Sequence, residues 1–295
     1  MSRVIHTHRA RYTDQIGTGP ESRENQRMLT VCRRRLALTA GLLFGLLGGH
    51  GALAADLARE QRITEQIEDA ILEGDPLYLN FGGRRFMGIY TRSDAERTRG
   101  AVILLHGRGA NPDWQDVIQP LRTGLPEHGW DTLSIQLPVE SADAPDRAWD
   151  ALIPAAAPRI DAALQALAPR EYPKFVLIGH SFGARMATEY LASRDPASLP
   201  QISALVAVGL PVDDSARTRG TLEALGKIDL PILDIYGERD LARVLEGAQD
   251  RRMTALDAKN TEYRQVEIAD ADHFFANQDT QLVARVRAWL SRYSD

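Results

Sequence analysis

The stretch FVLIGHSFGARMA, residues 175–187, joins an apolar run to a Gly-x-Ser-x-Gly motif and then to residues that favour a helix. Gly179 and Gly183 flank Ser181, at positions where a side chain would collide with a tightly bent backbone. A nucleophile elbow has this strand–turn–helix order, because the sharp turn lifts the serine hydroxyl clear of the sheet. The stretch therefore predicts a strand, a turn and a helix, with Ser181 as a candidate nucleophile on the turn.

Short apolar strands alternate with helical stretches on either side of this motif. LYLNF and RRFMGIYTR flank Gly82 and Gly83, which is typical of an antiparallel hairpin. Further strands are expected at 101–106, 132–137, 174–179, 203–209, 231–237 and 263–268, and helices at 57–73, 115–128, 154–168, 182–194, 219–226, 241–258 and 278–292. This alternation indicates a mostly parallel sheet with helices on both faces. The sequence predicts one three-layer α/β domain over residues 55–295.

A serine hydroxyl needs a base to remove its proton, so the histidines decide whether Ser181 can act. The chain after residue 54 has His106, His128, His180 and His273. His273 follows the last predicted strand, and the carboxyl ends of parallel strands converge on the site of such a sheet. We therefore expect His273 to be the base. His180 is expected to point away from its neighbour Ser181, and His128 to have a structural role at a helix end.

The base needs a carboxylate that orients its imidazole ring and offsets its charge. Asp240, in YGERD, follows a predicted strand and precedes His273, which gives the chain order Ser, Asp, His. The competing role for Asp240 is a helix N-cap. Asp234 lies inside a predicted strand, while Asp270 and Asp272 lie close to the histidine. We expect Asp240 rather than Asp272, because adjacent side chains in extended backbone face opposite ways.

The loop HGRGAN, residues 106–111, follows the first predicted parallel strand. We expect the backbone N–H groups of Phe182 and Arg108 to stabilise an oxyanion. The supporting turns consist of His106, Gly107, Gly109, Gly179 and Gly183. A glycine-rich loop can also cradle a phosphate, but this one has neither the Gly-x-Gly-x-x-Gly nor the P-loop pattern. The Arg108 side chain has two open roles, facing solvent or attracting an anionic group of a substrate.

The N-terminal 54 residues have the layout of a secretory signal peptide. Arginines at 33–35 precede an apolar run at 36–49, and a small-residue site, Ala-Leu-Ala, ends at Ala54. We expect translation to start at Met28, cleavage after Ala54 and export to the periplasm, with no stable membrane partner afterwards. The alternative is an uncleaved membrane anchor, although the run of 14 residues is shorter than the roughly 20 that a spanning helix needs.

Composition excludes several classes of partner and cofactor. Residues 55–295 contain 27 basic and 37 acidic residues, a formal net charge of −10, which disfavours nucleic acid and anionic membranes. Cys32 is the only cysteine and precedes the apolar run, so the exported chain would lack disulfides and thiolate sites. No cluster has the spacing of metal ligands, and we expect neither a metal nor an organic cofactor.

The motifs HGRG, GHSFG, GERD and ADHFF occur in this order, and together they resemble the α/β-hydrolase superfamily over most of residues 77–293. The segment HGRGANPDWQDVIQPLRTGLPEHGWDTLSIQLP, residues 106–138, is similar to a family of exported bacterial α/β-hydrolase-like proteins of unassigned function. The resemblance implies a three-layer α/β-hydrolase fold. It also implies a nucleophile at Ser181, a base at His273, an orienting acid at Asp240 and oxyanion donors at Phe182 and Arg108.

Many lipases of this fold carry a lid after the sixth strand of the sheet. Here about twenty residues, 210–230, follow that strand, and most are polar or charged, so a short helix fits but an apolar lid does not. An open site suits small soluble esters, thioesters or an acyl group on a larger partner. The leading hypothesis is therefore a periplasmic serine hydrolase of the EC 3.1 class that acts on carboxylic esters or thioesters through an acyl-enzyme. The alternatives are a non-catalytic binding protein of the cell envelope with the same fold, and a serine peptidase, for which no cap or propeller is present to select peptides.

Overall fold

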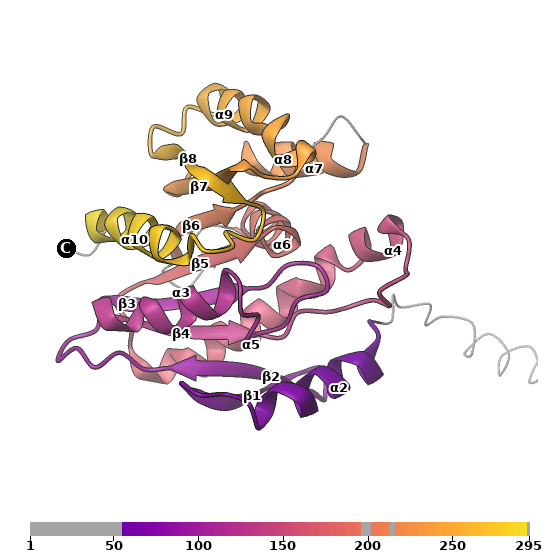
Figure 1. Cartoon of the computed structure of the whole chain (residues 1–295), viewed down its shortest axis with the longest axis vertical. Helices are drawn as coiled ribbons and strands as arrows, with labels where there is room; N and C mark the ends of the chain where they lie inside the picture. Colours follow the sequence, from indigo (N-terminus) through magenta and orange to yellow (C-terminus); the bar gives the residue numbers. More distant parts are fainter. Residues whose placement is uncertain (1–54, 196–201, 213–215, 294–295) are drawn as a thin grey trace, which may run out of the picture. The chain divides into compact units, whose positions relative to one another are not determined.

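The computed structural model describes residues 55–195, 202–212 and 216–293 (Figure 1). It shows a mixed β-sheet with helices on both faces. Leu53–Asp295 form one compact unit. The predicted start at Met28, signal peptide and cleavage site lie outside the described residues and stay predictions. Every helix within the described ranges is too short or too polar to cross a bilayer.

The described strands form one eight-stranded sheet in the order β1-β2-β4-β3-β5-β6-β7-β8. Their bounds are β1 Asp75–Phe81, β2 Arg84–Thr91, β3 Gly100–Leu105, β4 Trp130–Ile135, β5 Phe175–His180, β6 Ile202–Val208, β7 Ile232–Arg239 and β8 Tyr263–Asp272. Strand β2 pairs antiparallel with β1 and β4, and all other neighbours are parallel. The predicted entry by a hairpin into a parallel sheet is confirmed.

Nine α-helices are present in the described ranges. They are α2 Leu57–Glu68, α3 Ile118–Gly124, α4 Asp146–Asp150, α5 Ala157–Leu167, α6 Phe182–Ala192, α7 Ala216–Leu225, α8 Ala242–Leu245, α9 Ala248–Asp257 and α10 Asp279–Leu290. Short 3-10 helices are η1 Pro126–His128, η2 Ile153–Ala156, η3 Ala168–Arg170 and η5 Ser291–Tyr293. The described part of the connection between β6 and β7 holds α7 alone, with no large lid.

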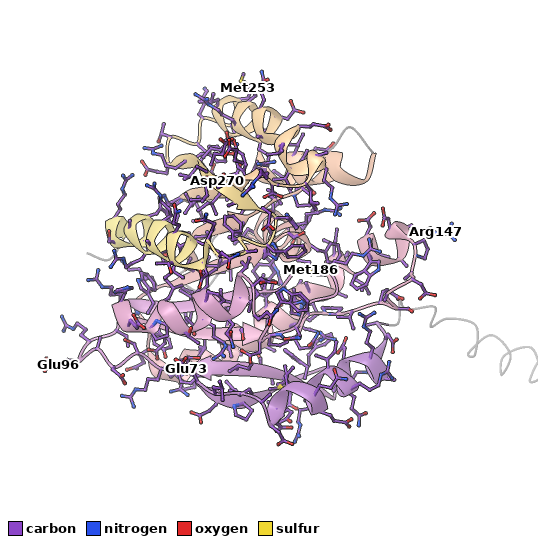
Figure 2. All side chains as sticks on the ribbon, in the orientation of Figure 1. Glu73, Glu96, Arg147, Met186, Met253 and Asp270 are labelled. Atoms are coloured by element: carbon purple, nitrogen blue, oxygen red, sulfur yellow. The ribbon has the colours of Figure 1, made fainter. Side chains whose placement is uncertain are left out.

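Both faces of the sheet are buried, which explains why the central strands are continuously apolar. On β3, Ile103 and Leu105 pack in the cluster that includes α5 and α6, whereas Val102 and Leu104 pack in the cluster that includes α3 and α10. Figure 1 shows α3 and α10 on one face of the sheet and α5 and α6 on the other. Met186 of α6 lies inside the molecule, whereas Met253 of α9 points outward (Figure 2). The predicted three-layer arrangement is confirmed.

The structure departs from the expected elements in several places. The helix expected at 115–128 is divided into α3 and η1, and α4 was not expected. The helix expected at 57–73 ends at Glu68, before the chain turns toward β1. The helix expected at 241–258 is divided into α8 and α9, and a Cβ at the intervening Gly247 would lie 2.8 Å from the Cβ of Val212. Strand β8 continues four residues past the expected end at 268, as far as Asp272. This extension places the next residue, His273, at the carboxyl edge of the sheet.

Candidate active site

Ser181 lies on the turn between β5 and α6 with a φ of +53° and a ψ of −113°. Non-glycine residues rarely adopt a positive φ, so the position is strained. The flanking glycines make the turn possible. A Cβ at Gly179 would lie 2.6 Å from the Cα of Ala184, and a Cβ at Gly183 would overlap the carbonyl oxygen of Leu105. The Ser181 N–H donates to the carbonyl of Val208 at 2.8 Å, which ties the turn to β6.

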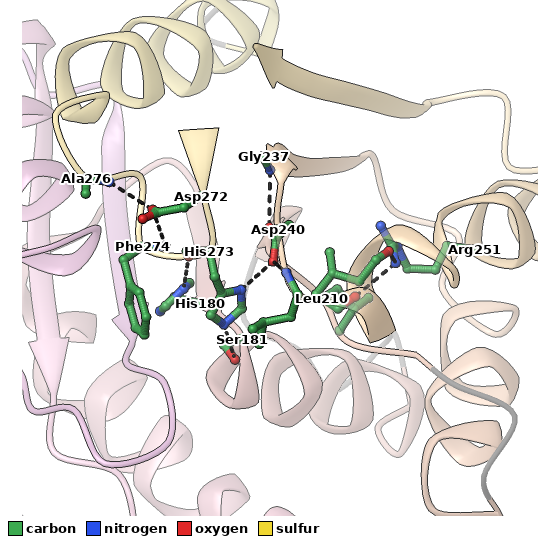
Figure 3. A network of polar contacts seen from close by, with 12 residues as sticks. His180, Ser181, Leu210, Gly237, Asp240, Arg251, Asp272, His273, Phe274 and Ala276 are labelled. Atoms are coloured by element: carbon green, nitrogen blue, oxygen red, sulfur yellow. Dashed lines mark hydrogen bonds and ion pairs between the residues drawn. The ribbon is translucent and has the colours of Figure 1, made fainter. Parts of the chain in front are cut away.

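The structure brings Ser181, His273 and Asp240 into one chain of hydrogen bonds (Figure 3). The Oγ of Ser181 lies 2.9 Å from Nε2 of His273, and Nδ1 of His273 lies 2.6 Å from Oδ1 of Asp240. All three residues are buried. An ionised carboxylate can only accept, so Nδ1 carries the proton and Nε2 is available to accept the serine proton. The three side chains follow the carboxyl ends of β5, β7 and β8.

Asp240 is held as a carboxylate by hydrogen bonds other than the one to His273. Its Oδ1 accepts the N–H of Leu241 at 2.8 Å, and its Oδ2 accepts the N–H of Gly237 at 3.2 Å. Burial by itself raises the pKa of Asp240, but the His273 interaction and these N–H groups outweigh it and lower the pKa. The N-cap of α8 is Leu241, so Asp240 does not cap this helix.

The other nearby carboxylates bind different partners. Oδ1 of Asp272 accepts the N–H groups of Phe274 at 3.0 Å and Ala276 at 3.1 Å, which shapes the loop that carries His273 (Figure 3). Asp234 accepts Nε–H of Arg251 in a buried ion pair of 2.7 Å. Asp270 is exposed and faces Arg239.

His106 and His180 are neutral supports of the site. Nε2 of His106 accepts the N–H of Leu137 at 3.0 Å, and Nδ1 donates to the carbonyl of Gly107 at 2.9 Å. Burial lowers the pKa of His106 to about 4. His180 donates from Nε2 to the carbonyl oxygen of His273 at 3.0 Å, and the two rings lie 4.9 Å apart. Burial, and then the neighbouring His273, lower the pKa of His180 to about 3.

This contact of His180 with His273 was missed by the sequence reasoning, which considered only its adjacency to Ser181. The two residues that form it are 93 positions apart in the chain. No local pattern indicates that the ring of His180 supports the backbone of His273. The contact depends on the loop after β8 folding back over the end of β5.

The loop after β3 lies against the elbow, as a second oxyanion donor requires. A Cβ at Gly107 would lie 3.5 Å from the Cβ of Ser181. Phe182 is the first residue of α6, so its N–H has no acceptor within the helix. The Arg108 side chain forms an ion pair of 2.6 Å with Asp146 and stacks over the ring of Trp149 at 4.8 Å.

A cleft of about 300 Å³ opens above Ser181. Its lining consists of Arg59, Gly107, Arg108, Gly109, Ala110, Trp114, Ala142, Trp149, His180, Ser181, Leu241, Arg243, His273 and Phe274. The cleft therefore combines the hydrogen-bonded serine and histidine with aromatic rings and arginines. Such a site has room for a small group beside the hydroxyl of Ser181.

Solved structures with this fold include several hydrolases. XC6422 from Xanthomonas campestris, described as an α/β serine hydrolase without lid, aligns with a TM-score of 0.56 and 16% identity over 76% of this chain and 96% of its own. The Pyrococcus furiosus esterase Pf2001 aligns with a TM-score of 0.60 and 18% identity over 78% of this chain and 96% of its own. Est1E from Butyrivibrio proteoclasticus, with ferulic acid bound, aligns with a TM-score of 0.57 and 14% identity over 73% of this chain and 98% of its own. At such identities the likeness shows the α/β-hydrolase fold.

Sequence comparison places the chain in a family without assigning an activity. No curated protein matches it. One family model, however, matches residues 49–158 and 153–292, which together cover most of the chain. The chain belongs to the family described as "Protein of unknown function (DUF3530)" and has an α/β-hydrolase fold without a large lid in the part that the structure describes.

Proposed function

We propose that the protein is a serine hydrolase that cleaves carboxylic esters or thioesters through an acyl-enzyme. The observation that carries this proposal is the hydrogen-bond chain from Ser181 Oγ through His273 to Asp240, with distances of 2.9 and 2.6 Å. The positive φ of Ser181 supports it, because strained residues cluster at functional sites. The neighbours Pf2001, an esterase, and Est1E, which has ferulic acid bound, are consistent with a small carboxylic ester as substrate.

In the proposed reaction, Ser181 Oγ attacks the ester carbonyl while Nε2 of His273 takes the hydroxyl proton. Asp240 keeps the imidazole oriented and stabilises the imidazolium that forms. The N–H groups of Phe182 and Arg108 stabilise the oxyanion. His273 then gives its proton to the leaving alcohol or thiol, and the acyl group stays on Ser181. Water, activated by the same histidine, releases the acid and restores the serine.

We also propose that the protein acts in the periplasm after removal of residues 1–54. The support is the order of arginines, apolar run and Ala-Leu-Ala site in the sequence. N-terminal sequencing of the protein recovered from a periplasmic extract tests this. A mature chain that begins at Ala55 is expected, and recovery of an uncleaved chain in the membrane fraction would contradict it.

Labelling with a neutral fluorophosphonate tests the hydrolase proposal, because the probe reacts with a serine that a base activates. We expect the folded protein to be labelled and the Ser181→Ala variant to lose all labelling. The matched control is Ser291→Ala, an exposed serine in η5, which keeps wild-type labelling. Circular dichroism of each variant establishes that it is folded. Equal labelling of wild type and Ser181→Ala, or no labelling of the folded wild type, argues for the binding-protein alternative.

A further inference from the structure

The cleft above Ser181 is rich in positive charge. Among the described residues its lining includes Arg59, Arg108 and Arg243 and no aspartate or glutamate. The positive charge of this lining is opposite in sign to that of the domain, since residues 55–295 have a formal net charge of −10. A cationic cleft on an acidic body indicates that the positive charge has a local role.

Two of these arginines keep their charge uncompensated. Arg108 is the exception, because it pairs with Asp146 at 2.6 Å. Nη1 of Arg59 donates to the backbone carbonyl of Glu140 at 2.7 Å, an uncharged acceptor. Within the described ranges neither Arg59 nor Arg243 forms an ion pair with a carboxylate.

Arg243 has a further unmet interaction. Its Nε is buried and has no hydrogen-bond partner among the described residues. Buried donors are nearly always satisfied, so a guanidinium at a cleft wall that forms no hydrogen bond to any described residue is a candidate partner for an incoming oxyanion. Arg243 lies on α8, three residues after Asp240 in the chain, and lines the cleft together with Ser181 and His273.

The remaining walls of the cleft are apolar. Trp114, Trp149, Leu241 and Phe274 contribute to the lining, and Leu241 and Phe274 are exposed. Apolar walls accommodate a hydrocarbon chain, whereas arginines bind carboxylate or phosphate groups through paired N–H donors. The lining therefore suits a molecule that has both a short hydrocarbon part and an oxyanionic group.

We infer that the substrate of this site is an ester or thioester that carries a carboxylate or phosphate group, which Arg243 and Arg59 bind while Ser181 attacks the carbonyl. This inference rests on the proposed function. It names the chemical class of substrate that the hydrolase selects. Neutral esters remain weak substrates, because they leave the arginines without a counter-charge.

Two pairs of esters test the inference. Mono-p-nitrophenyl adipate and p-nitrophenyl hexanoate differ in a charge on the acyl side. The compounds 4-butyryloxybenzoate and its methyl ester differ in a charge on the alcohol side. The quantity measured is the ratio of kcat/KM for the charged ester to that for its neutral partner, in wild type and in each variant. Comparing ratios between proteins cancels the intrinsic reactivity of each ester.

We expect Arg243→Gln to lower this ratio about tenfold for at least one pair, because a charge-assisted hydrogen bond to the charged ester is lost. The kcat/KM for the neutral ester should change much less than that for the charged ester. Arg59→Gln lowers it in the same direction, and Arg243→Lys keeps part of it. The matched control Arg252→Gln, an exposed arginine on α9, leaves the ratio unchanged. Competition by adipate and by phenyl phosphate shows which oxyanion binds more tightly.

The outcomes separate the inference from the function beneath it. The inference is overturned if the charged-to-neutral ratios are the same in wild type, Arg243→Gln and Arg59→Gln. If fluorophosphonate labelling and ester turnover are nevertheless present, the proposed function stays intact. Absence of both labelling and turnover in the folded wild type would overturn the proposed function, and the inference with it.

Discussion

Ser181 and the two neutral histidines next to it show how single residues shape the site. The strained φ of Ser181 costs of the order of 1–3 kcal/mol, which the surrounding structure has to offset. His106 secures the loop after β3, and His180 secures the backbone of His273. Both histidines are held without charge by burial, so the fold depends on their staying neutral.

That dependence predicts a loss of stability in acid. The pKa values of His106 and His180, about 4 and about 3, lie below the roughly 6.5 of an unfolded histidine. Between these limits the unfolded chain binds more protons than the folded one, so stability falls as the pH decreases from about 6.5. Urea titration is expected to show a free energy of unfolding about 2 kcal/mol or more lower at pH 4.5 than at pH 7. His106→Gln reduces this difference, and an unchanged difference in that variant would contradict the account.

At the scale of elements, the elbow depends on how closely β3, β5 and α6 approach one another. Gly183 on α6 leaves no space for a side chain beside Leu105 of β3, and Gly179 on β5 leaves none beside Ala184. The glycines of the motif are thus required by the packing of a helix on a sheet. Their backbone freedom is a smaller part of the explanation, because neither has a positive φ.

Gly183→Ala is therefore expected to destabilise the fold. Overpacking against backbone costs about 1–3 kcal/mol, and the shift of α6 also moves the N–H of Phe182, so ester turnover falls with stability. The control is Gly220→Ala on α7, where the new Cβ would lie 3.6 Å from Oε1 of Glu189 and alanine favours the helix. Thermal unfolding measures the stability of both variants. A Gly183→Ala variant as stable as Gly220→Ala would show that the elbow can relax.

At the scale of the whole molecule, a buried polar network joins the second half of the chain. Arg251 of α9 donates to Asp234 of β7 at 2.7 Å and to the carbonyl oxygens of Leu210 and Val244. Tyr263 of β8 also donates to Asp234, at 2.5 Å. The network links the elements that carry Asp240 and His273 to the end of β6.

Breaking one side of this network leaves a buried charge without a partner. Arg251→Leu is expected to lower the free energy of unfolding by about 3–5 kcal/mol, and the double variant Arg251→Leu/Asp234→Leu by less. Chemical denaturation of the single and double variants measures the coupling. Arg252→Leu, an exposed neighbour, is the control and changes stability by about 0.5 kcal/mol or less. Additive losses in the double variant would show that the pair is not coupled.

The sequence by itself determined the fold class and the position of the candidate nucleophile. Continuous apolar runs indicate strands buried on both faces, and the steric need for glycine around Ser181 is local, so both are visible without a structure. The sequence also predicted that Ser181, Asp240 and His273 meet, because each follows a strand that ends at the same edge of a parallel sheet. The predicted end of the last strand, at residue 268, was wrong by four residues, because no turn residue marks the end of β8.

Only the tertiary structure decided which other side chains meet at that edge. The contact of His180 with His273 and the ion pair of Arg108 with Asp146 join residues 93 and 38 positions apart. The uncompensated arginines of the cleft come from α2 and α8, which are far apart in the domain sequence. Such contacts depend on how distant loops fold together over the sheet. Local patterns carry no information about that, since they record only the spacing of neighbours along the chain.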